Sequence, residues 1–219
     1  MNQILTDAEI RVLGSLIEKQ ITTPEYYPLS LNALKNASNQ SSNRDPVVSY
    51  DERTVQAALD SLREKKLVWL FRGADSRVPK YGHIFVEAFD LKPQEVAALC
   101  VLMLRGPQTV GEIRGRTGRL YNFEGLAEVE AILEGLMQRE GPPLVAKLPR
   151  QAGRKDHRYA QLLGGEVAVE EEAATTRPDA AASHSPAERI RRLEEEVEAL
   201  RREMAELNEQ FAAFKKQFE

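Results

Sequence analysis

The sequence predicts a mainly α-helical protein with small β wings, in which two tandem winged-helix domains precede a C-terminal coiled-coil helix. Three observations lead to this prediction. One order of helical and strand-like patterns occurs twice, both occurrences start their helices with the same capping residues, and the end of the chain spaces its apolar residues by three and four. The predicted segments are domains at 1–90 and 91–165, a disordered linker at 166–187 and a coiled-coil helix at 188–219.

The repeat is visible in three pairs of segments, whose offset falls along the chain from 86 to 79 and then 74 residues. A falling offset with an unchanged order of elements indicates a duplicated domain with shorter connections in the second copy. The pairs are LTDAEIRVLGSL from Leu5 with LKPQEVAALCVL from Leu91, PLSLNAL from Pro28 with PQTVGEI from Pro107, and VQAALDSL from Val55 with VEAILEGL from Val129.

The first copy contains three predicted helices. Thr6 and Glu9 have the spacing of a capping box, which predicts a helix start just before the apolar stripe that begins at Ile10. A second helix is expected from Ser30, and a third from Ser49 with Glu52 three residues later. The third helix has a continuous inner stripe at Val55, Ala58, Leu59 and Leu62.

The second copy repeats these signals. Thr109 and Glu112 form the matching capping box, and the third helix has its stripe at Val129, Ile132, Leu133 and Leu136. Each third helix is followed by two strand-like runs around a polar turn, which predicts a hairpin wing. The runs are LVWLF and YGHIFV in the first copy, and PLVAKL and RYAQLL in the second. Because each copy has fewer than 90 residues, we expect the two to pack together.

Long stretches of the first copy resemble a known family. LGSLIEKQITTPEYYPLSLNALKNASNQSSNRDPV, followed by LDSLREKKLVW and SRVPKYGHIF, closely resembles the bacterial YceH-like family, which is classed as a domain of unknown function. The resemblance extends over roughly residues 5–165. It implies two consecutive winged-helix domains, and it implies no established activity, ligand or catalytic residue.

Composition argues against several functional classes. No apolar run approaches the roughly 18–20 residues of a membrane span, and the N-terminus lacks a secretory pattern, so a cytoplasmic protein is expected. The histidines His83, His157 and His184 are far apart, and the single cysteine, Cys100, lies in the apolar run VAALCVLML. We therefore predict no catalytic residues, no metal site and no cofactor.

Charge is distributed unevenly along the chain. Residues 1–90 carry 11 Lys/Arg and 12 Asp/Glu, residues 91–165 carry 11 and 8, and residues 166–219 carry 8 and 14. The overall charge of −4 therefore comes from the tail, and the region of the second copy is basic. This distribution leaves double-stranded DNA open as a partner, although the whole chain is acidic.

The expected wings supply most of the candidate phosphate contacts, because basic wings commonly follow the sugar-phosphate backbone of DNA. His83 and His157 also fall in these wings, and a solvated hairpin is the alternative interpretation. In the first copy, Arg53 and Gln56 on the third helix are the candidates for base contact. The predicted nucleic-acid-binding residues are Arg53, Gln56, Arg72, Arg77, Lys80, Arg114, Arg116, Arg119, Arg150, Arg154, Lys155 and Arg158.

Two segments point to other surfaces. The third helix of the second copy carries Glu124, Glu128, Glu130 and Glu134 at expected outward positions, which is unfavourable in a DNA groove. The polar segment NASNQSSNRDPV, from Asn36 to Val47, is expected between helices two and three. It is either a loop that contacts phosphate or a protein partner, or an ordered surface loop whose polar side chains bond one another.

The C-terminal segment has the strict alternation of a coiled-coil seam. Opposite charges at the flanking positions, Arg189 with Glu194 and Glu196 with Arg201, favour a parallel homodimer. The alternative is an amphipathic helix that packs on the rest of the chain. The seam residues are Ile190, Leu193, Val197, Leu200, Met204, Leu207, Phe211, Phe214 and Phe218.

These observations favour a non-enzymatic DNA-binding or regulatory protein that dimerises through its C-terminal helix. The competing hypothesis is a protein-interaction adaptor that uses the winged-helix faces without binding DNA.

Overall fold

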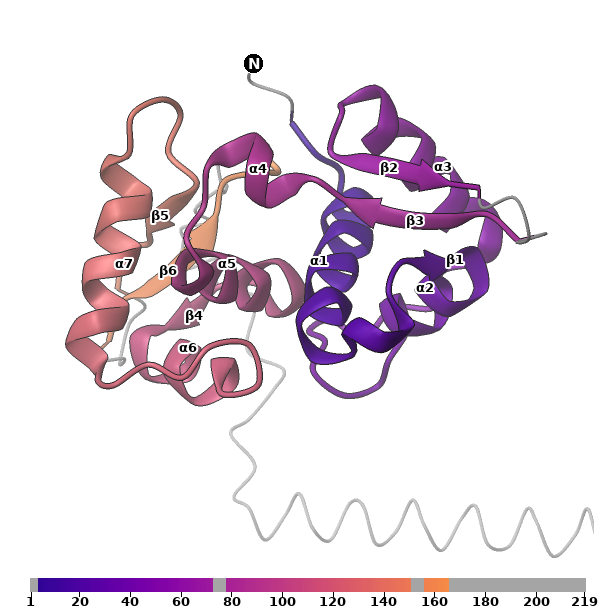
Figure 1. Cartoon of the computed structure of the whole chain (residues 1–219). Helices are drawn as coiled ribbons and strands as arrows, with labels where there is room; N and C mark the ends of the chain where they lie inside the picture. The colour runs from indigo at the N-terminus through magenta and orange to yellow at the C-terminus, as the bar shows by residue number, and fades with distance from the viewer. Residues whose placement is uncertain (1–3, 73–77, 151–155, 166–219) are drawn as a thin grey trace, which may run out of the picture. The chain divides into compact units, whose positions relative to one another are not determined.

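The computed structural model describes residues 4–72, 78–150 and 156–165, which all belong to one compact unit spanning Met1–Val169 (Figure 1). Within these residues the chain is mainly helical, with seven α-helices, one short 3₁₀ helix and two small three-stranded antiparallel sheets. The predicted linker and coiled coil, residues 166–219, lie outside the described part of the chain.

The same order of elements occurs twice, as the sequence repeat predicts. The first copy consists of α1 (Asp7–Thr22), β1 (Leu29–Ser30), α2 (Leu31–Ser38), α3 (Glu52–Glu64), β2 (Val68–Phe71) and β3 (Lys80–His83), with the 3₁₀ helix η1 (Pro24–Tyr26) after α1. After the short helix α4 (Phe85–Phe89), the second copy consists of α5 (Pro93–Arg105), β4 (Gln108–Thr109), α6 (Val110–Thr117), α7 (Leu126–Gln138), β5 (Val145–Lys147) and β6 (Arg158–Gln161).

The two sheets have equivalent topologies, with strand orders β1-β3-β2 and β4-β6-β5. In each sheet the two-residue strand pairs antiparallel with the last strand, so that Ser30 lies opposite Lys80 and Thr109 opposite Arg158. Ser30 and Thr109 are also the N-caps of α2 and α6, and each hydroxyl accepts a backbone N–H three residues later. One residue therefore ends the strand and starts the helix in both copies.

Several sequence predictions are confirmed in detail. Both capping boxes form: Thr6 with Glu9 at α1, and Thr109 with Glu112 at α6. The inner stripe of α3 is buried as predicted, and so is that of α7 except for Ile132, which is partly buried.

Other boundaries differ from the predictions. The predicted start of the third helix at Ser49 is wrong, because α3 begins at Glu52 and Asp51 caps it by accepting the Thr54 N–H at 2.8 Å. The predicted strand YGHIFV ends at His83, and Phe85 begins helix α4 instead. The short strands β1 and β4 were not predicted. The polar loop also starts later than expected, because α2 extends to Ser38.

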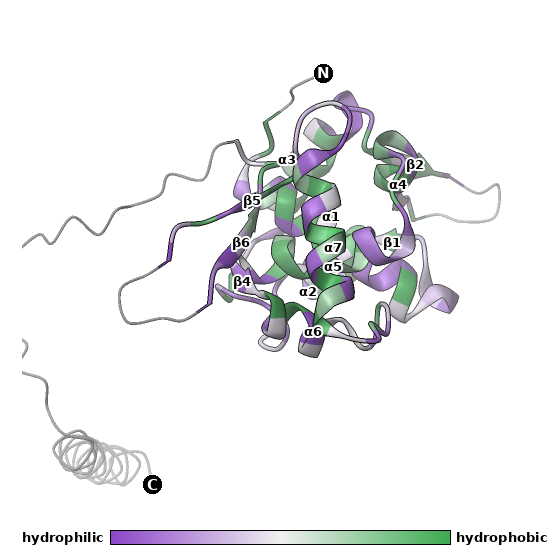
Figure 2. Ribbon diagram, turned by 90° about the vertical axis from the view of Figure 1, so that its left-hand side faces the viewer, coloured by the Kyte–Doolittle hydropathy of each residue, from purple (hydrophilic) through white to green (hydrophobic). Residues whose placement is uncertain are grey.

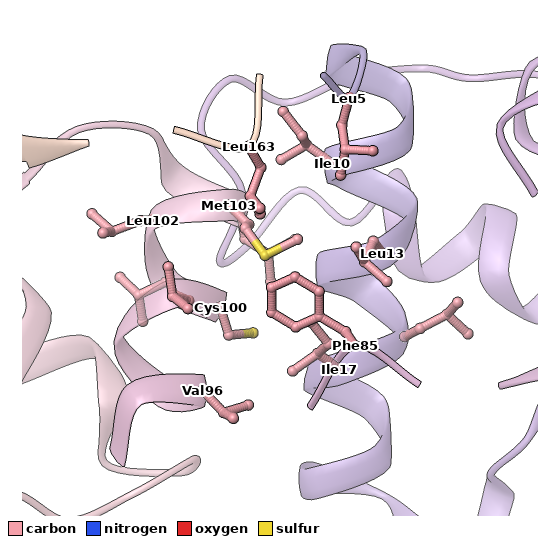
Figure 3. Packing of buried hydrophobic residues seen from close by; sticks show 14 of the residues in the cluster. Leu5, Ile10, Leu13, Ile17, Phe85, Val96, Cys100, Leu102, Met103 and Leu163 are labelled. Atoms are coloured by element: carbon pink, nitrogen blue, oxygen red, sulfur yellow. The ribbon is translucent and has the colours of Figure 1, made fainter. Parts of the chain in front are cut away.

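The two copies meet where α1 packs against α5, in the middle of the view in Figure 1. Gly14 on α1 allows this approach: a Cβ atom at this position would lie 3.0 Å from Leu104 Cδ2 and 3.2 Å from Met103 Cβ. Cys100 on α5 donates its thiol to the Gly14 carbonyl at 3.6 Å. Figure 3 shows Met103 and Phe85 filling the space beside these helices.

One continuous hydrophobic core serves both copies. Apolar residues line the inward faces of the helices in Figure 2, whereas β5 and β6 lead into hydrophilic segments. The segment before α1 also pairs with the segment after β6, since the Leu5 N–H donates to the Leu163 carbonyl at 2.8 Å. None of the described helices has both the length and the hydropathy needed to cross a bilayer.

The polar loop between α2 and α3 is ordered around a buried arginine. The Arg44 side chain is 0% exposed, and its guanidinium donates to both carboxylate oxygens of Glu18 on α1, at 3.0 and 2.7 Å. It also donates to the Ala37 carbonyl at 2.8 Å. Asn39 spans the loop by bonding both the N–H and the carbonyl of Tyr50. These bonds support the interpretation of an ordered loop held by its own polar groups.

The same loop also contacts the second copy. The Asp45 N–H donates to the Leu104 carbonyl at 2.9 Å, and the Arg105 guanidinium donates to the Asn43 amide oxygen. Both of these α5 residues lie in its last turn, where a helix leaves carbonyls without partners of its own. The loop therefore connects α1 of the first copy to the end of α5 of the second.

We predict that Gly14→Val destabilises the protein by about 1–3 kcal/mol, because the larger side chain overpacks the contact between α1 and α5. The matched control is Gly135→Val in α7, where an added Cβ would meet nothing within 4 Å. That change should be neutral or slightly stabilising, since valine disfavours a helix less than glycine does. Urea unfolding measures both, and equal unfolding free energies would contradict the proposed role of Gly14.

We predict that Arg44→Met lowers the free energy of unfolding by about 3–5 kcal/mol, because it leaves the Glu18 carboxylate without its buried partner. Glu18→Gln should lower the free energy of unfolding less in the Arg44→Met variant than in the wild type, because the ion pair is already absent there. Arg63→Met serves as control: its pair with Asp60, at 3.4 Å, is exposed, so the loss should stay within about 1 kcal/mol. Similar losses for Arg44→Met and Arg63→Met would contradict this account.

Candidate nucleic-acid interface

In the first copy, helix α3 and the β2–β3 hairpin are joined by side chains. The Tyr81 hydroxyl on β3 donates to the Gln56 amide oxygen on α3 at 3.2 Å, and the Gln56 amide nitrogen donates to Asp60 at 3.0 Å. Arg53 lies one turn before Gln56 and is exposed. The two predicted base-contacting residues are therefore on the same helix face, but both polar atoms of the Gln56 amide already have partners in the protein.

Three of the predicted contact cations of the first copy are available to a ligand. Arg53 at the start of α3, Arg72 after β2 and Lys80 at the start of β3 form no side-chain hydrogen bond or ion pair within the described residues. Phe71 pairs with Lys80 in the sheet, so Arg72 and Lys80 both lie at the end of the hairpin where the two strands are connected. Arg77, the remaining predicted contact of this hairpin, lies outside the described residues.

His83 does not belong with these cations. Its side chain is buried, its Nδ1 accepts the Phe85 N–H at 3.3 Å, and its backbone N–H donates to the Tyr27 hydroxyl at 2.6 Å. Burial lowers the pKa of His83 to about 4, with Glu87 opposing the shift, so the imidazole is neutral at pH 7. The sequence-based assignment of His83 to the basic surface of the wing is therefore wrong.

In the second copy, the predicted cations of α6 and β6 bind groups within the protein. Arg158 donates to the Pro107 carbonyl at 3.0 Å and approaches the Glu112 carboxylate at 3.5 Å. Arg116 donates to the Gln108 amide oxygen and lies 3.8 Å from Glu112. Burial would raise the pKa of Glu112, but the Thr109 N–H and the two arginines outweigh it and hold the pKa below its usual value.

The remaining predicted contacts of the second copy are dispersed. Arg114 donates to the Glu124 carbonyl at 3.2 Å, and Arg150 donates to His157 Nε2 at 3.0 Å. Arg119 is exposed and makes no hydrogen bond or ion pair with described residues, but it follows α6 and does not belong to the hairpin. Arg154 and Lys155 lie outside the described residues.

The expected acidic face of α7 is present in part. Glu130 and Glu134 are exposed on the helix, whereas Glu124 precedes it and is exposed in the connecting loop. Glu128 is partly buried, and its carboxylate accepts the Tyr121 hydroxyl at 3.3 Å and the Glu124 N–H at 2.8 Å. A groove between α7 and the β5–β6 hairpin has mixed charge, because Glu130, Asp156, Lys147 and Arg150 all line it.

The described part of the chain contains no cluster of metal-ligating side chains. There, no group of three or more His, Cys, Asp or Glu residues is placed to hold a metal ion. Cys100 is buried as expected, and burial raises the pKa of its thiol. The predicted dimerisation residues, from Ile190 to Phe218, are outside the described residues.

Sequence reasoning missed two cations, Lys19 on α1 and Arg105 on α5. They line the same cleft as Arg116 and Arg119, at the junction of the two copies. A basic residue in the last turn of each of two repeat-related helices was the available signal. It identifies the residues but not their proximity, because the two helix ends meet only through the packing of α1 on α5.

Comparisons with known proteins place the chain in a family. A family model described as "Protein of unknown function, DUF480" matches residues 5–154. A UPF0502 protein of Opitutus terrae is 56% identical over 198 residues, which cover 90% of this chain and 84% of that relative. UPF0502 proteins of Pelobacter propionicus and Solibacter usitatus are 53% and 52% identical, with 100% of each chain covered. The resemblance to the YceH-like family is thereby confirmed, and the chain belongs to the DUF480 family of UPF0502 proteins.

Proposed function

We propose that the protein is a cytoplasmic, non-enzymatic regulator whose two copies are winged-helix domains, and that it binds double-stranded DNA through the first of them. The order of elements supports this proposal, since each copy runs helix, strand, helix, helix and then a two-stranded hairpin. In such modules the third helix faces the major groove and the hairpin lies along the neighbouring backbone. Helix α3 and the β2–β3 hairpin take these two positions in the first copy.

The observation that carries the proposal is the hydrogen bond between Tyr81 and Gln56. It fixes the β2–β3 hairpin against the face of α3 that bears Arg53, so that helix and hairpin are held in one arrangement. Lys80 is the neighbour of Tyr81 on β3 and lies on the other face of the hairpin, with Phe71. Neither Arg53 nor Lys80 forms a hydrogen bond or a close ion pair with a described side chain, although the nearby Asp51 carboxylate interacts electrostatically with Arg53. A preformed surface with free cations binds phosphate without first breaking ion pairs, and each neutralised phosphate releases counterions.

The first copy is the stronger candidate because its cations are free. In the sequence only the second of the two copies has an excess of basic residues, with 11 Lys/Arg and 8 Asp/Glu against 11 and 12 in the first. The described cations of the second copy, however, are largely held by Glu112, by backbone carbonyls and by His157. We propose that these residues mainly stabilise the second copy, while its exposed Glu130 and Glu134 keep α7 out of a DNA groove.

We propose that residues 188–219 join two chains as a parallel coiled coil, on the basis of the seam and the flanking charges in the sequence. A dimer would present two first copies to one duplex. Because the second contact would then be intramolecular, the pair would bind more tightly than a single chain.

A protein-interaction adaptor is the second candidate function, and an exposed aromatic pair favours it. Trp69 and Phe71 on the edge strand β2 are 37% and 46% exposed, with their rings edge-to-face and centroids 6.3 Å apart. Exposed aromatic residues on a sheet edge are typical of protein-binding surfaces. The adaptor hypothesis is preferred if DNA binding is absent at low salt.

We predict that the full-length protein binds duplex DNA with an affinity that falls steeply with salt, measured by fluorescence anisotropy from about 50 to 200 mM NaCl. Arg53→Ala, Arg72→Ala and Lys80→Ala should each weaken binding and reduce the slope of log K against log salt by about 1 for each phosphate that the variant no longer neutralises. Lys92→Ala is the charge-matched control, because Lys92 is exposed in the connection between the copies. Absent or salt-insensitive binding at about 50 mM would refute the DNA proposal.

We predict that Leu200→Asp converts a dimer to a monomer, because it places a charge in the proposed coiled-coil seam. Ala199→Asp introduces the same charge one residue away, outside the seam, and should leave the dimer intact. Light scattering of the full-length variants gives the mass. A monomeric wild type, or an unchanged mass for Leu200→Asp, would show that this segment does not hold the chains together.

A further inference from the structure

A small cleft lies where the two copies meet. It has a volume of about 150 Å³, and its walls come from the C-terminal half of α1, the polar loop after α2, the end of α5 and the segment around the end of α6. Cys100, Val101 and Leu104 on α5 supply the buried apolar part of its lining. The cleft thus has a hydrophobic base and a polar rim contributed by both copies.

The rim has a strong excess of positive charge. Lys19, Arg105, Arg116 and Arg119 line the cleft, whereas Glu18 is the one carboxylate among its lining residues, and it is held by Arg44. Burial lowers the pKa of Arg105, and the nearby charges of Arg116 and Arg44 lower it further against the opposing effect of Asp45 and Glu18. Cations that repel one another around a concave surface favour an anion between them.

Much of the hydrogen-bonding capacity at this rim is unused by the protein. Arg119 has no hydrogen-bond or ion-pair partner among the described residues, and Lys19 makes only long contacts, at 3.5 Å to Gln40 and 3.7 Å to Glu18. The hydroxyl of Ser42 is exposed on the same rim. Cationic and neutral donors around a shallow cavity are the combination that recognises the oxygens of a phosphate group.

We propose that this cleft binds the phosphate group of a small dissolved anion between the two copies of the chain. Lys19 and Ser42 would contact it from the first copy, and Arg105 and Arg119 from the second. The proposal goes beyond DNA binding, because it requires neither α3 nor the hairpins. It also gives the polar loop a function: Arg44 and Asn43 hold Ser42 and Gln40 at the rim.

Because the anion would bridge both copies, its binding would stabilise their packing as well as each copy alone. A ligand that binds only the folded state raises stability with its concentration. At roughly 100 times the dissociation constant, the expected rise in Tm is about 5–10 °C for a chain of this size. The same ligand should slow amide exchange in residues 40–45 and 116–120, which form two sides of the cleft.

The test uses the full-length protein with inorganic phosphate and with pyrophosphate, each compared with NaCl at the same ionic strength. Thermal unfolding and hydrogen–deuterium exchange are measured together. We expect both phosphates to raise Tm beyond the chloride reference and to protect residues 40–45. Arg119→Gln should remove both effects and preserve the fold, because Arg119 is exposed and unpaired among the described residues. Arg105→Gln should weaken them.

The matched control is Arg63→Gln, which removes one exposed cation from α3, outside the cleft, and should keep the full response to phosphate. The proposal is overturned if phosphate raises Tm and protects residues 40–45 equally in Arg119→Gln and the wild type. It is also overturned if phosphate has no effect beyond that of chloride. Measuring DNA binding by the same variants distinguishes a small dissolved phosphate from the phosphates of the DNA backbone. If Arg119→Gln weakens DNA binding while inorganic phosphate and pyrophosphate have no effect, the cleft serves the DNA backbone and the small-anion proposal is wrong. Loss of DNA binding in Arg53→Ala does not bear on the cleft.

Discussion

The close packing of α1 against α5 at Gly14 is the contact on which the rest of the structure depends. These two helices are repeat-related, so the same element of each copy forms one side of the contact. Without a Cβ at Gly14 the helices approach closely enough for Met103 and Leu104 to cover the α1 backbone. Each copy alone is small and would leave this apolar face exposed to water. The contact therefore converts two marginal units into one continuous core.

The packing of α1 on α5 also decides what each charged residue can do. The Arg44 side chain is completely buried within the first copy and pairs with Glu18 on α1, so a cation of the polar loop becomes part of the structure. Lys19 and Arg105 are brought to one cleft from helices that are distant in sequence. In the second copy, Glu112 attracts Arg116 and Arg158. Arg53, Arg72 and Lys80 form no close ion pair among the described residues, although Asp51 interacts with Arg53 at longer range.

Local sequence signals predicted elements well where the deciding interactions are local. The capping boxes at Thr6 and Thr109 and the stripe of α3 need only residues three or four apart, and they are confirmed. The start of α3 was wrong by three residues, because Ser49 and Asp51 are both good caps. Asn39 resolves the choice by bonding both backbone groups of Tyr50 from across the loop, which leaves Asp51 to cap the helix. Phe85 likewise leaves the predicted strand because it packs into the core beside Phe89.

The sequence by itself determined the duplication, the family and the order of helices and hairpins, because periodicity and capping are properties of neighbouring residues. It also identified the basic residues, but it could not say which of them are free. Only the tertiary structure decided that His83 is buried and neutral, that Arg158 is bound to the protein and that Arg53 is not. Those outcomes depend on the burial of each group and on partners up to about fifty positions away, such as Pro107 for Arg158. A charge is defined by its residue type, whereas its availability is defined by what the fold places beside it.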